Sequence, residues 1–261
     1  MKIIVFTLFV ALFVSCGTAQ KVSEKQSSKV CLNMNSFTTS ANSSEDTTFA
    51  NLNVCFYEVQ EEPHHYAVNE LIKTYMGIQW MSENSIVNDS LNSAYFEKFT
   101  AAFFEEYTLA KTDWEDMGPW FLEMDISIDD SSMKNFVNCS LTTYTYTGGA
   151  HPNGATTYYV VNKSTGELLF LEDVCVNITE LNKKVEPYFL VQNEIPEGTN
   201  YEEYGLSFDD NQFHVSENYW FDTENVYFFY NQYEIGPYSA GTFEVKVPIV
   251  EIKELFSIEF N

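Results

Sequence analysis

The sequence predicts an α+β fold in which an antiparallel β-sheet packs with a few helices, and in which two subdomains are closely associated. Three observations support this prediction. Between residues 68 and 107, apolar side chains recur at helical spacing. After residue 121, apolar and polar residues alternate, as they do in strands with one buried face. Helical and strand-like segments also follow one another in runs, which favours α+β over a parallel α/β fold.

The first half of the chain is expected to contain one strand and two helices. Residues 49–60 partly alternate, which is typical of a strand. A polar break at Pro63-His64-His65 follows, and residues 68–76 then show helical spacing. The second helix is clearer, because its apolar stripe lies opposite charged residues. This stripe consists of Tyr95, Phe96, Phe99, Ala102, Phe103 and Tyr107.

The second half is predicted to be mostly strands joined by turns. Residues 122–128 alternate strictly, and residues 137–147 are rich in β-branched and aromatic side chains. A helix should begin after Asn177, and Pro187 is expected to disturb it. Further strands are expected at 156–161, 168–171, 213–221, 226–235 and 242–247, with a short closing helix at 248–256.

The N-terminus is typical of an exported bacterial lipoprotein. Ile3–Val14 is an apolar run of 12 residues, shorter than the roughly 20 residues that span a bilayer but suited to a signal peptide. Ser15-Cys16-Gly17 resembles a lipobox, which implies a signal peptide at 1–15, lipidation of Cys16 and a tether at 16–29. We expect a membrane anchor in the cell envelope, facing the periplasm from the outer membrane. The alternative is an ordinary secretory signal that is cut near Ala19.

The charge balance restricts the possible partners. The chain has 13 basic and 38 acidic residues, for a formal net charge of −25. Binding to phosphate backbones requires a basic surface, so nucleic acid is excluded as a partner. Long-range attraction instead favours a basic protein. An acidic surface that only confers solubility is the alternative.

The cysteines predict two disulfide bonds. If Cys16 carries lipid, an even number of cysteines remains in an oxidising compartment. We favour pairs within each half of the chain, although four cysteines allow three pairings. No two cysteines have metal-binding spacing, so we expect no metal and no cofactor. The predicted pairs are Cys31–Cys55 and Cys139–Cys175.

Two stretches carry a specific resemblance. Residues 144–153 contain the motif Gly-Gly-Ala-His-Pro, and residues 230–241 contain Tyr-Glu-Ile-Gly-Pro-Tyr. In this order they resemble a PdaC/RsiV-like extracytoplasmic domain family, a domain of unknown function shared by a peptidoglycan deacetylase and an anti-sigma factor that binds lysozyme. The resemblance implies a PdaC-like α+β domain at 30–125 and a second domain, with both motifs, at 126–261.

The resemblance also implies a function. The sequence shows neither a separate deacetylase domain nor a sigma-binding segment. What remains is a non-catalytic binding module of the cell envelope, held to the membrane by its N-terminal lipid. Its expected ligand is a peptidoglycan-type glycan or a basic, lysozyme-like protein. The alternative is a hydrolase, or a deacetylase-related enzyme, that acts on envelope polysaccharide and uses His151 with nearby carboxylates.

The candidate binding loop is the first motif, whose glycines suit a hairpin turn. The same loop could place His151 as a general base, but no serine or cysteine nucleophile stands in a recognisable motif nearby, so no catalytic residue is assigned. The aspartate pairs at 129–130 and 209–210 are expected to be solvated turns rather than calcium ligands. The loop residues are Gly148, Gly149, Ala150, His151, Pro152 and Asn153, and the second motif contributes Tyr233, Pro237, Tyr238 and Gly241, which are expected to be structural.

Overall fold

The computed structural model describes residues 34–43, 47–81 and 89–260, all of which fall within one compact unit. The predicted α+β class is confirmed. We refer to residues 34–162 as the five-stranded region and to residues 168–260 as the three-stranded region, after the sheet that each contains. No helix among the described residues is long and apolar enough to cross a bilayer. The expected signal peptide, Cys16 and the tether lie outside the described residues.

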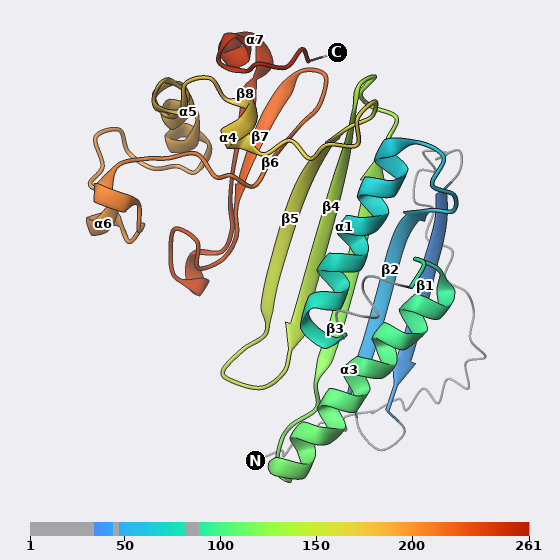
Figure 1. Ribbon diagram of the computed structural model, residues 1–261. Helices are drawn as coiled ribbons and strands as arrows, with labels where there is room; N and C mark the ends of the chain where they lie inside the picture. Colours follow the sequence, from blue (N-terminus) through green and yellow to red (C-terminus); the bar gives the residue numbers. More distant parts are fainter. Residues whose placement is uncertain (1–33, 44–46, 82–88, 261) are drawn as a thin grey trace, which may run out of the picture. The chain divides into compact units, whose positions relative to one another are not determined.

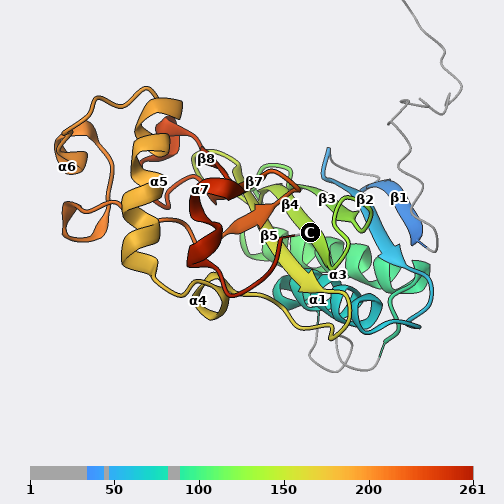
Figure 2. The ribbon, with the colours of Figure 1, turned by 90° about the horizontal axis from the view of Figure 1, so that it is seen from above.

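The five-stranded region has strands in chain order and two helices on one face (Figures 1 and 2). Neighbouring strands are antiparallel, except that β2 and β3 are parallel. This parallel pair follows from the connection, because both helices lie between the two strands in the sequence and carry the chain back. The elements are β1 (Met34–Asn42), β2 (Phe49–Tyr57), α1 (Pro63–Trp80), α3 (Ser93–Asp113), β3 (Phe121–Asp129), β4 (Phe136–Tyr146) and β5 (Asn153–Asn162).

Alternation in the strands and helical spacing in α1 and α3 build one core. In β3 every second residue from Leu122 to Ile128 is buried. The stripe predicted for α3 is buried at Phe96, Phe99 and Phe103, and Asn92 caps this helix by accepting a hydrogen bond from the Tyr95 N–H at 3.1 Å. The core therefore lies between the sheet and the two helices.

The three-stranded region is built around one longer helix and many aromatic side chains. Phe189 of α5 packs its ring against Phe208, Phe213 and Tyr230, with ring centroids 5.0–5.8 Å apart. The elements are α4 (Leu171–Val174), α5 (Ile178–Gln192), α6 (Tyr201–Tyr204), β6 (Tyr219–Phe221), β7 (Asn225–Tyr230), β8 (Phe243–Pro248) and α7 (Ile249–Ile252), with short 3-10 turns at Asp209–Asn211, Tyr238–Ala240 and Lys253–Leu255.

Asparagine side chains join the two regions. The amide of Asn218 donates to the Thr156 carbonyl at 2.8 Å and accepts from the Tyr158 N–H at 2.8 Å. Asn231 makes a similar pair of bonds with the backbone of Thr156. Asn138 of β4 donates to the Phe221 carbonyl at 2.9 Å. The outer edge of β5 is thus bonded by two side-chain amides in place of another strand.

Several local expectations differ from the structure. Residues 168–171 form only a single bridge, between Leu168 and Val161, before α4 begins. Pro187 lies inside α5 without ending it, because buried side chains such as Val185 and Phe189 hold the helix on both sides. Of the strand expected at 213–221, only β6 forms. The domain boundary expected between residues 125 and 126 falls within β3, so the first sheet takes strands from both expected segments.

Candidate functional site

The two sequence motifs meet in space. The ring of His151 stacks on the ring of Tyr238, with centroids 3.8 Å apart and planes 24° apart. The Tyr233 hydroxyl lies 2.8 Å from His151 Nε2, and the Tyr233 and Tyr238 rings are 5.7 Å apart. We call His151, Tyr233 and Tyr238 the motif cluster. Tyr233 is 57% exposed and His151 is also exposed, so the cluster presents ring surface to solvent.

Backbone conformation explains both motifs. Gly148 and Gly149 have φ of 105° and 98°, values that side-chain-bearing residues rarely adopt, and they turn the chain between β4 and β5. The Tyr146 hydroxyl donates to the Gly149 carbonyl at 3.0 Å and braces this loop. In the second motif, Tyr233 itself has φ of 69°. Such a conformation is costly for a bulky residue, and it is kept here at an exposed contact between two loops.

The ring nitrogens of His151 are both engaged. Nδ1 lies 2.8 Å from the carbonyl oxygen of the next residue, Pro152. Because a carbonyl only accepts, Nδ1 carries the hydrogen, and Nε2 of the neutral ring then accepts from the Tyr233 hydroxyl. His151 is thus bonded to its own loop through Nδ1 and to the second motif through Nε2. Asn153 begins β5, opposite Thr145.

Pro237 and Gly241 flank the turn that carries Tyr238. Pro237 stands just before the 3-10 turn Tyr238–Ala240, and Gly241 ends it with φ of 77°. Glu234, which follows Tyr233, accepts from the Asn231 N–H at 2.8 Å and from the Ser216 hydroxyl at 2.9 Å. These contacts fix the second motif against the segment that contains Ser216.

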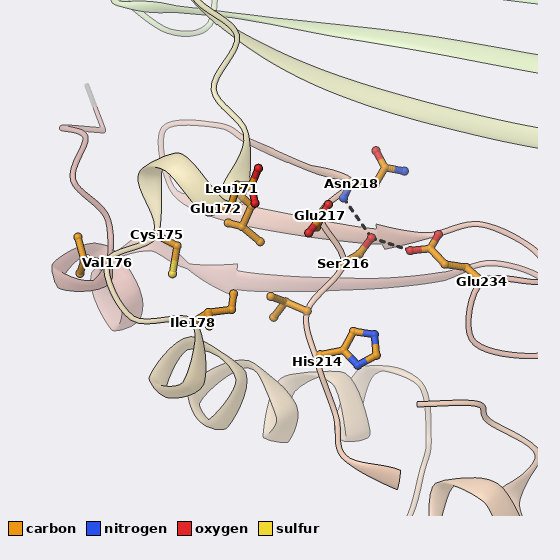
Figure 3. A pocket seen from close by; sticks show the side chains of 11 residues that line it. Leu171, Glu172, Cys175, Val176, Ile178, His214, Ser216, Glu217, Asn218 and Glu234 are labelled. Atoms are coloured by element: carbon orange, nitrogen blue, oxygen red, sulfur yellow. Dashed lines mark hydrogen bonds between the residues drawn. The ribbon is translucent and has the colours of Figure 1, made fainter. Parts of the chain in front are cut away.

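A cavity of about 780 Å³ adjoins this segment (Figure 3). Ser216 stands on its wall and accepts from the Asn218 N–H at 3.1 Å while donating to Glu234. Glu172, Glu217 and His214 add polar groups to the lining. Sequence reasoning missed this cavity, because its walls come from three separate segments near residues 171–178, 214–218 and 234, and only the last of these belongs to a sequence motif.

An aromatic surface also follows β2, β3 and β4. Phe121 stacks on Phe49 with ring centroids 5.6 Å apart, and it contacts Tyr144 and Tyr146 at 5.3 and 6.0 Å. Tyr144 is exposed and the other three rings are half-buried. Since Tyr146 also bonds to Gly149, this surface leads to the first motif loop.

The aspartate and histidine pairs noted in the sequence lie in two kinds of place: some of the aspartates are in turns, and both histidines are buried. Asp129 accepts from the N–H groups of Ser131 and Ser132, as expected for a turn, and Asp209 begins an exposed 3-10 turn. Asp130 instead pairs with Lys163, whose Nζ lies 2.9 Å from its Oδ1. His64 and His65 are in the first turn of α1 and are only 7% and 6% exposed.

The predicted Cys139–Cys175 disulfide is not formed. Both residues are free thiols. Cys139 belongs to the core of the five-stranded region, whereas Cys175 packs against the core of the three-stranded region. Burial raises the pKa of Cys139 to about 12 and also raises the pKa of Cys175. Cys31 lies outside the described residues, so its pairing with Cys55 stays a prediction.

Comparisons with known proteins agree with this architecture. No curated protein matches the sequence significantly. A solved structure of a DUF3298 family member from Bacteroides fragilis is similar, with 16% identity, a TM-score of 0.69 and coverage of 87% of this chain and 94% of that chain. A DUF3298 family protein from Pseudomonas aeruginosa matches with 14% identity, a TM-score of 0.59 and coverage of 86% and 94%. At these identities the similarity shows the fold.

Two family models divide the chain. Residues 67–154 match the family described as deacetylase PdaC, and residues 169–249 match DUF3298, a protein family of unknown function. The first motif falls in the first match and the second motif in the second, so the motif cluster forms where the two matched segments touch. The chain therefore contains a PdaC-type segment followed by a DUF3298 segment, which supports the resemblance to the PdaC-like domain family.

Proposed function

We propose that this chain is a non-catalytic binding module of the bacterial cell envelope, and that the motif cluster is part of its recognition surface for a peptidoglycan-type glycan. The observation that carries the proposal is the stack of the exposed His151 ring on the half-buried Tyr238 ring, 3.8 Å apart and braced by the exposed Tyr233. Two motifs that are 82 residues apart in the sequence contribute to it.

Exposed, fixed aromatic rings suit sugar recognition. The C–H faces of a sugar ring are apolar, and an aromatic face removes them from water while leaving the hydroxyl groups free to hydrogen-bond. Because His151 is bonded through both ring nitrogens, its orientation is set before a ligand arrives, which lowers the entropy lost on binding. The aromatic surface around Phe121 would extend the contact beyond one sugar unit.

The same geometry weighs against catalysis by His151. A general base needs a free nitrogen directed at the substrate, and the nitrogens of this ring are occupied by Pro152 and Tyr233. The cavities of about 780, 610, 370 and 200 Å³ are lined by other residues. An enzyme of envelope polysaccharide remains the alternative, and it would have to break the Tyr233 bond first.

A basic, lysozyme-like protein is the second candidate ligand, and the charge of the chain favours it. The formal net charge of −25 would attract a basic protein and speed the encounter. Exposed tyrosines are also common at the energetic centres of protein interfaces. Charge alone gives no specificity, so the two ligands must be separated by experiment.

Titration calorimetry with soluble peptidoglycan fragments, and separately with lysozyme, tests the proposal. We expect glycan binding that weakens about tenfold or more in Tyr238→Ala, which corresponds to about 1.4 kcal/mol or more. Tyr204→Ala serves as the matched control, because Tyr204 is an exposed tyrosine outside the cluster. Glycan binding that ignores Tyr238→Ala, or no glycan binding at all, would reject the glycan proposal.

Binding measured at raised salt concentration distinguishes specific recognition of lysozyme from general charge attraction. Beyond about 8 Å, exposed charges are largely screened at physiological ionic strength. Binding to lysozyme that persists in several-fold higher salt and responds to Tyr238→Ala would make the basic protein the ligand. Binding that disappears with salt and ignores the variant would reflect net charge only.

The proposed location rests on the N-terminal sequence. The apolar run that ends at Ser15-Cys16-Gly17 supports export and lipidation of Cys16, with the module facing the periplasm from the outer membrane. We expect Cys16→Ser to lose fatty-acid labelling and to leave the membrane fraction. A variant that still carries labelled fatty acid would contradict the lipoprotein assignment.

A further inference from the structure

A group of metal-ligating side chains lies outside the motif cluster. Among the described residues, His64, His65 and Asp130 each offer a ligand atom, and these three atoms all lie within 4.8 Å of one another. His64 Nε2 is 3.7 Å from Asp130 Oδ2. Bonds of about 2.0–2.2 Å in a tetrahedral site place neighbouring ligand atoms about 3.3–3.6 Å apart. A shift of about 1 Å or less would therefore bring the three atoms onto one ion.

The tautomer of His64 directs a lone pair toward Asp130. His64 Nδ1 lies 3.0 Å from the carbonyl oxygen of Lys163. A carbonyl only accepts, so Nδ1 carries a hydrogen, and Nε2 of the neutral ring then has its lone pair on the side of the Asp130 carboxylate. Histidines that bind metals usually donate their other N–H to a carbonyl or carboxylate in this way.

In His65 the two ring nitrogens exchange these roles: Nε2 donates, and Nδ1 has the lone pair. Its ring hydrogen-bonds the backbone of Val59, and its Nδ1 is buried with no hydrogen-bond partner. The bond to Val59 must then come from Nε2, which leaves the lone pair of Nδ1 unsatisfied. Unpartnered buried polar atoms are rare, and a bound ion is one of the explanations for them.

The surroundings hold these side chains in place. The Tyr57 ring stacks on His65 with centroids 3.9 Å apart and meets His64 edge-on at 5.6 Å. Lys163 Nζ binds Asp130 Oδ1 at 2.9 Å, which orients the carboxylate and leaves Oδ2 toward His64. Gly166 has φ of 73°, and a Cβ there would lie 2.7 Å from the Pro63 carbonyl oxygen, so the turn packs directly on the start of α1.

We propose that His64, His65 and Asp130 bind a divalent transition-metal ion of the Zn²⁺ type. Two imidazoles and one carboxylate are ligands that suit Zn²⁺. Three protein ligands leave a fourth position for water or a ligand group. His64 and Lys163 also line a cavity of about 610 Å³, together with Glu62, so one of the three proposed ligands borders this cavity. The proposal is independent of the glycan-binding function.

Metal titration of the full chain tests this site. Competition with a chromophoric chelator should give one Zn²⁺ per chain. X-ray absorption at the zinc edge should show nitrogen and oxygen ligands without sulfur, which separates this site from binding by thiols. Both measurements use the unaltered chain, so they do not depend on whether a variant folds. No binding, or a zinc ion coordinated by sulfur, would overturn the proposal.

Variants identify the ligands. We expect His64→Gln, His65→Gln and Asp130→Asn each to weaken Zn²⁺ binding about 100-fold or more, since losing only a supporting residue typically costs about 10- to 100-fold. The matched controls are His151→Gln and His214→Gln, which alter the other two of the four histidines and should bind as the unaltered chain does. Binding that survives the cluster variants, or fails equally in the controls, would assign the ion elsewhere.

Discussion

The two sheets of this protein are stabilised in different ways. The five-stranded region places two long helices on one sheet face, and its core follows regular alternation, as in β3. The three-stranded region has one longer helix and irregular segments, and Phe189 of α5 stands at the centre of an aromatic group that combines the loop residues Phe208 and Phe213 with Tyr230 of β7 and Phe243 of β8. The difference shows that regular alternation builds one core, whereas the other core combines a small sheet and a helix with aromatic side chains from loops. The predictions below test how independent the two regions are.

The largest effect is expected from Phe189→Ala, in the three-stranded region. Phe189 is fully buried, and its removal should lower the free energy of unfolding by about 3–5 kcal/mol. Hydrogen exchange followed by mass spectrometry should show the loss of protection mainly in residues 168–260. Val191→Ala is the control on the same helix, because Val191 is 79% exposed and should change stability by less than about 0.5 kcal/mol. An equal loss of protection in the five-stranded region would show that the two cores unfold as one.

A smaller effect is expected from Asn218→Ala, which removes two bonds between the regions. The N–H of Tyr158 and the carbonyl of Thr156, on the half-buried edge of β5, would lose their partners, which should lower the free energy of unfolding by about 1–3 kcal/mol. Chemical denaturation should detect this loss, and unfolding should separate into two transitions if the amides couple the regions. Asn218→Asp keeps the acceptor for Tyr158 but places a carboxylate oxygen against the Thr156 carbonyl, so it should destabilise the chain at least as much as Asn218→Ala. An Asn218→Asp variant as stable as the unaltered chain would contradict the role of the amide donor.

A pH-dependent effect is expected from Asp222→Ala, at the turn between β6 and β7. Burial raises the pKa of Asp222, but the N–H groups of Glu224 and Asn225 outweigh it, and the net pKa is below the ordinary value of 3.8. The carboxylate therefore contributes fully to stability at pH values above its ordinary pKa. This contribution is lost as the pH falls through the lowered pKa of the folded state. At neutral pH, the free energy of unfolding of the variant should be about 1 kcal/mol lower than that of the unaltered chain.

Denaturation over a range of pH checks this prediction. The stability difference between Asp222→Ala and the unaltered chain should narrow as pH falls below about 4. Asp209→Ala, an exposed aspartate in a 3-10 turn, is the control and should show no such trend. A difference that stays constant with pH would show that the turn does not depend on the charge of Asp222.

Alkylation of Cys139 and Cys175 compares the two regions without a substitution that changes stability. Cys139 is fully buried in the five-stranded region, with its pKa raised to about 12, whereas Cys175 is half-buried. The thiolate is the reactive form, so alkylation of the native chain should label Cys175 well before Cys139. Mass spectrometry gives the order of labelling. A disulfide-linked peptide that contains both residues would restore the pairing predicted from the sequence.

The sequence predicts the five-stranded region well because its signals are local. Strict alternation gave β3, and the apolar stripe between Tyr95 and Tyr107 gave α3. The parallel pairing of β2 and β3 depends on how two helices return the chain, which no local pattern encodes. In the three-stranded region, residues 213–218 resemble a strand in composition but are held by side-chain contacts, such as the bond from the Val215 N–H to Asn182.

The site was predicted in its parts and not in its arrangement. The sequence drew attention to the loop of His151 as a candidate binding loop and to Tyr233 and Tyr238 as structural residues. That they touch one another follows only from the tertiary fold. His64 and His65 appeared as a polar break, because burial and the approach of Asp130 from the end of β3 have no signal in the neighbouring sequence.

The parallel pair of strands also has a consequence for how the chain folds. β1 and β2 are neighbours in the sequence and can pair early, but β3 begins only at Phe121, long after β2 ends at Tyr57. Until β3 is available, one edge of β2 has no partner strand, and an open edge is prone to pair with other chains. Contacts between such distant segments also slow folding. During synthesis, β2 is therefore the strand that most needs protection from aggregation.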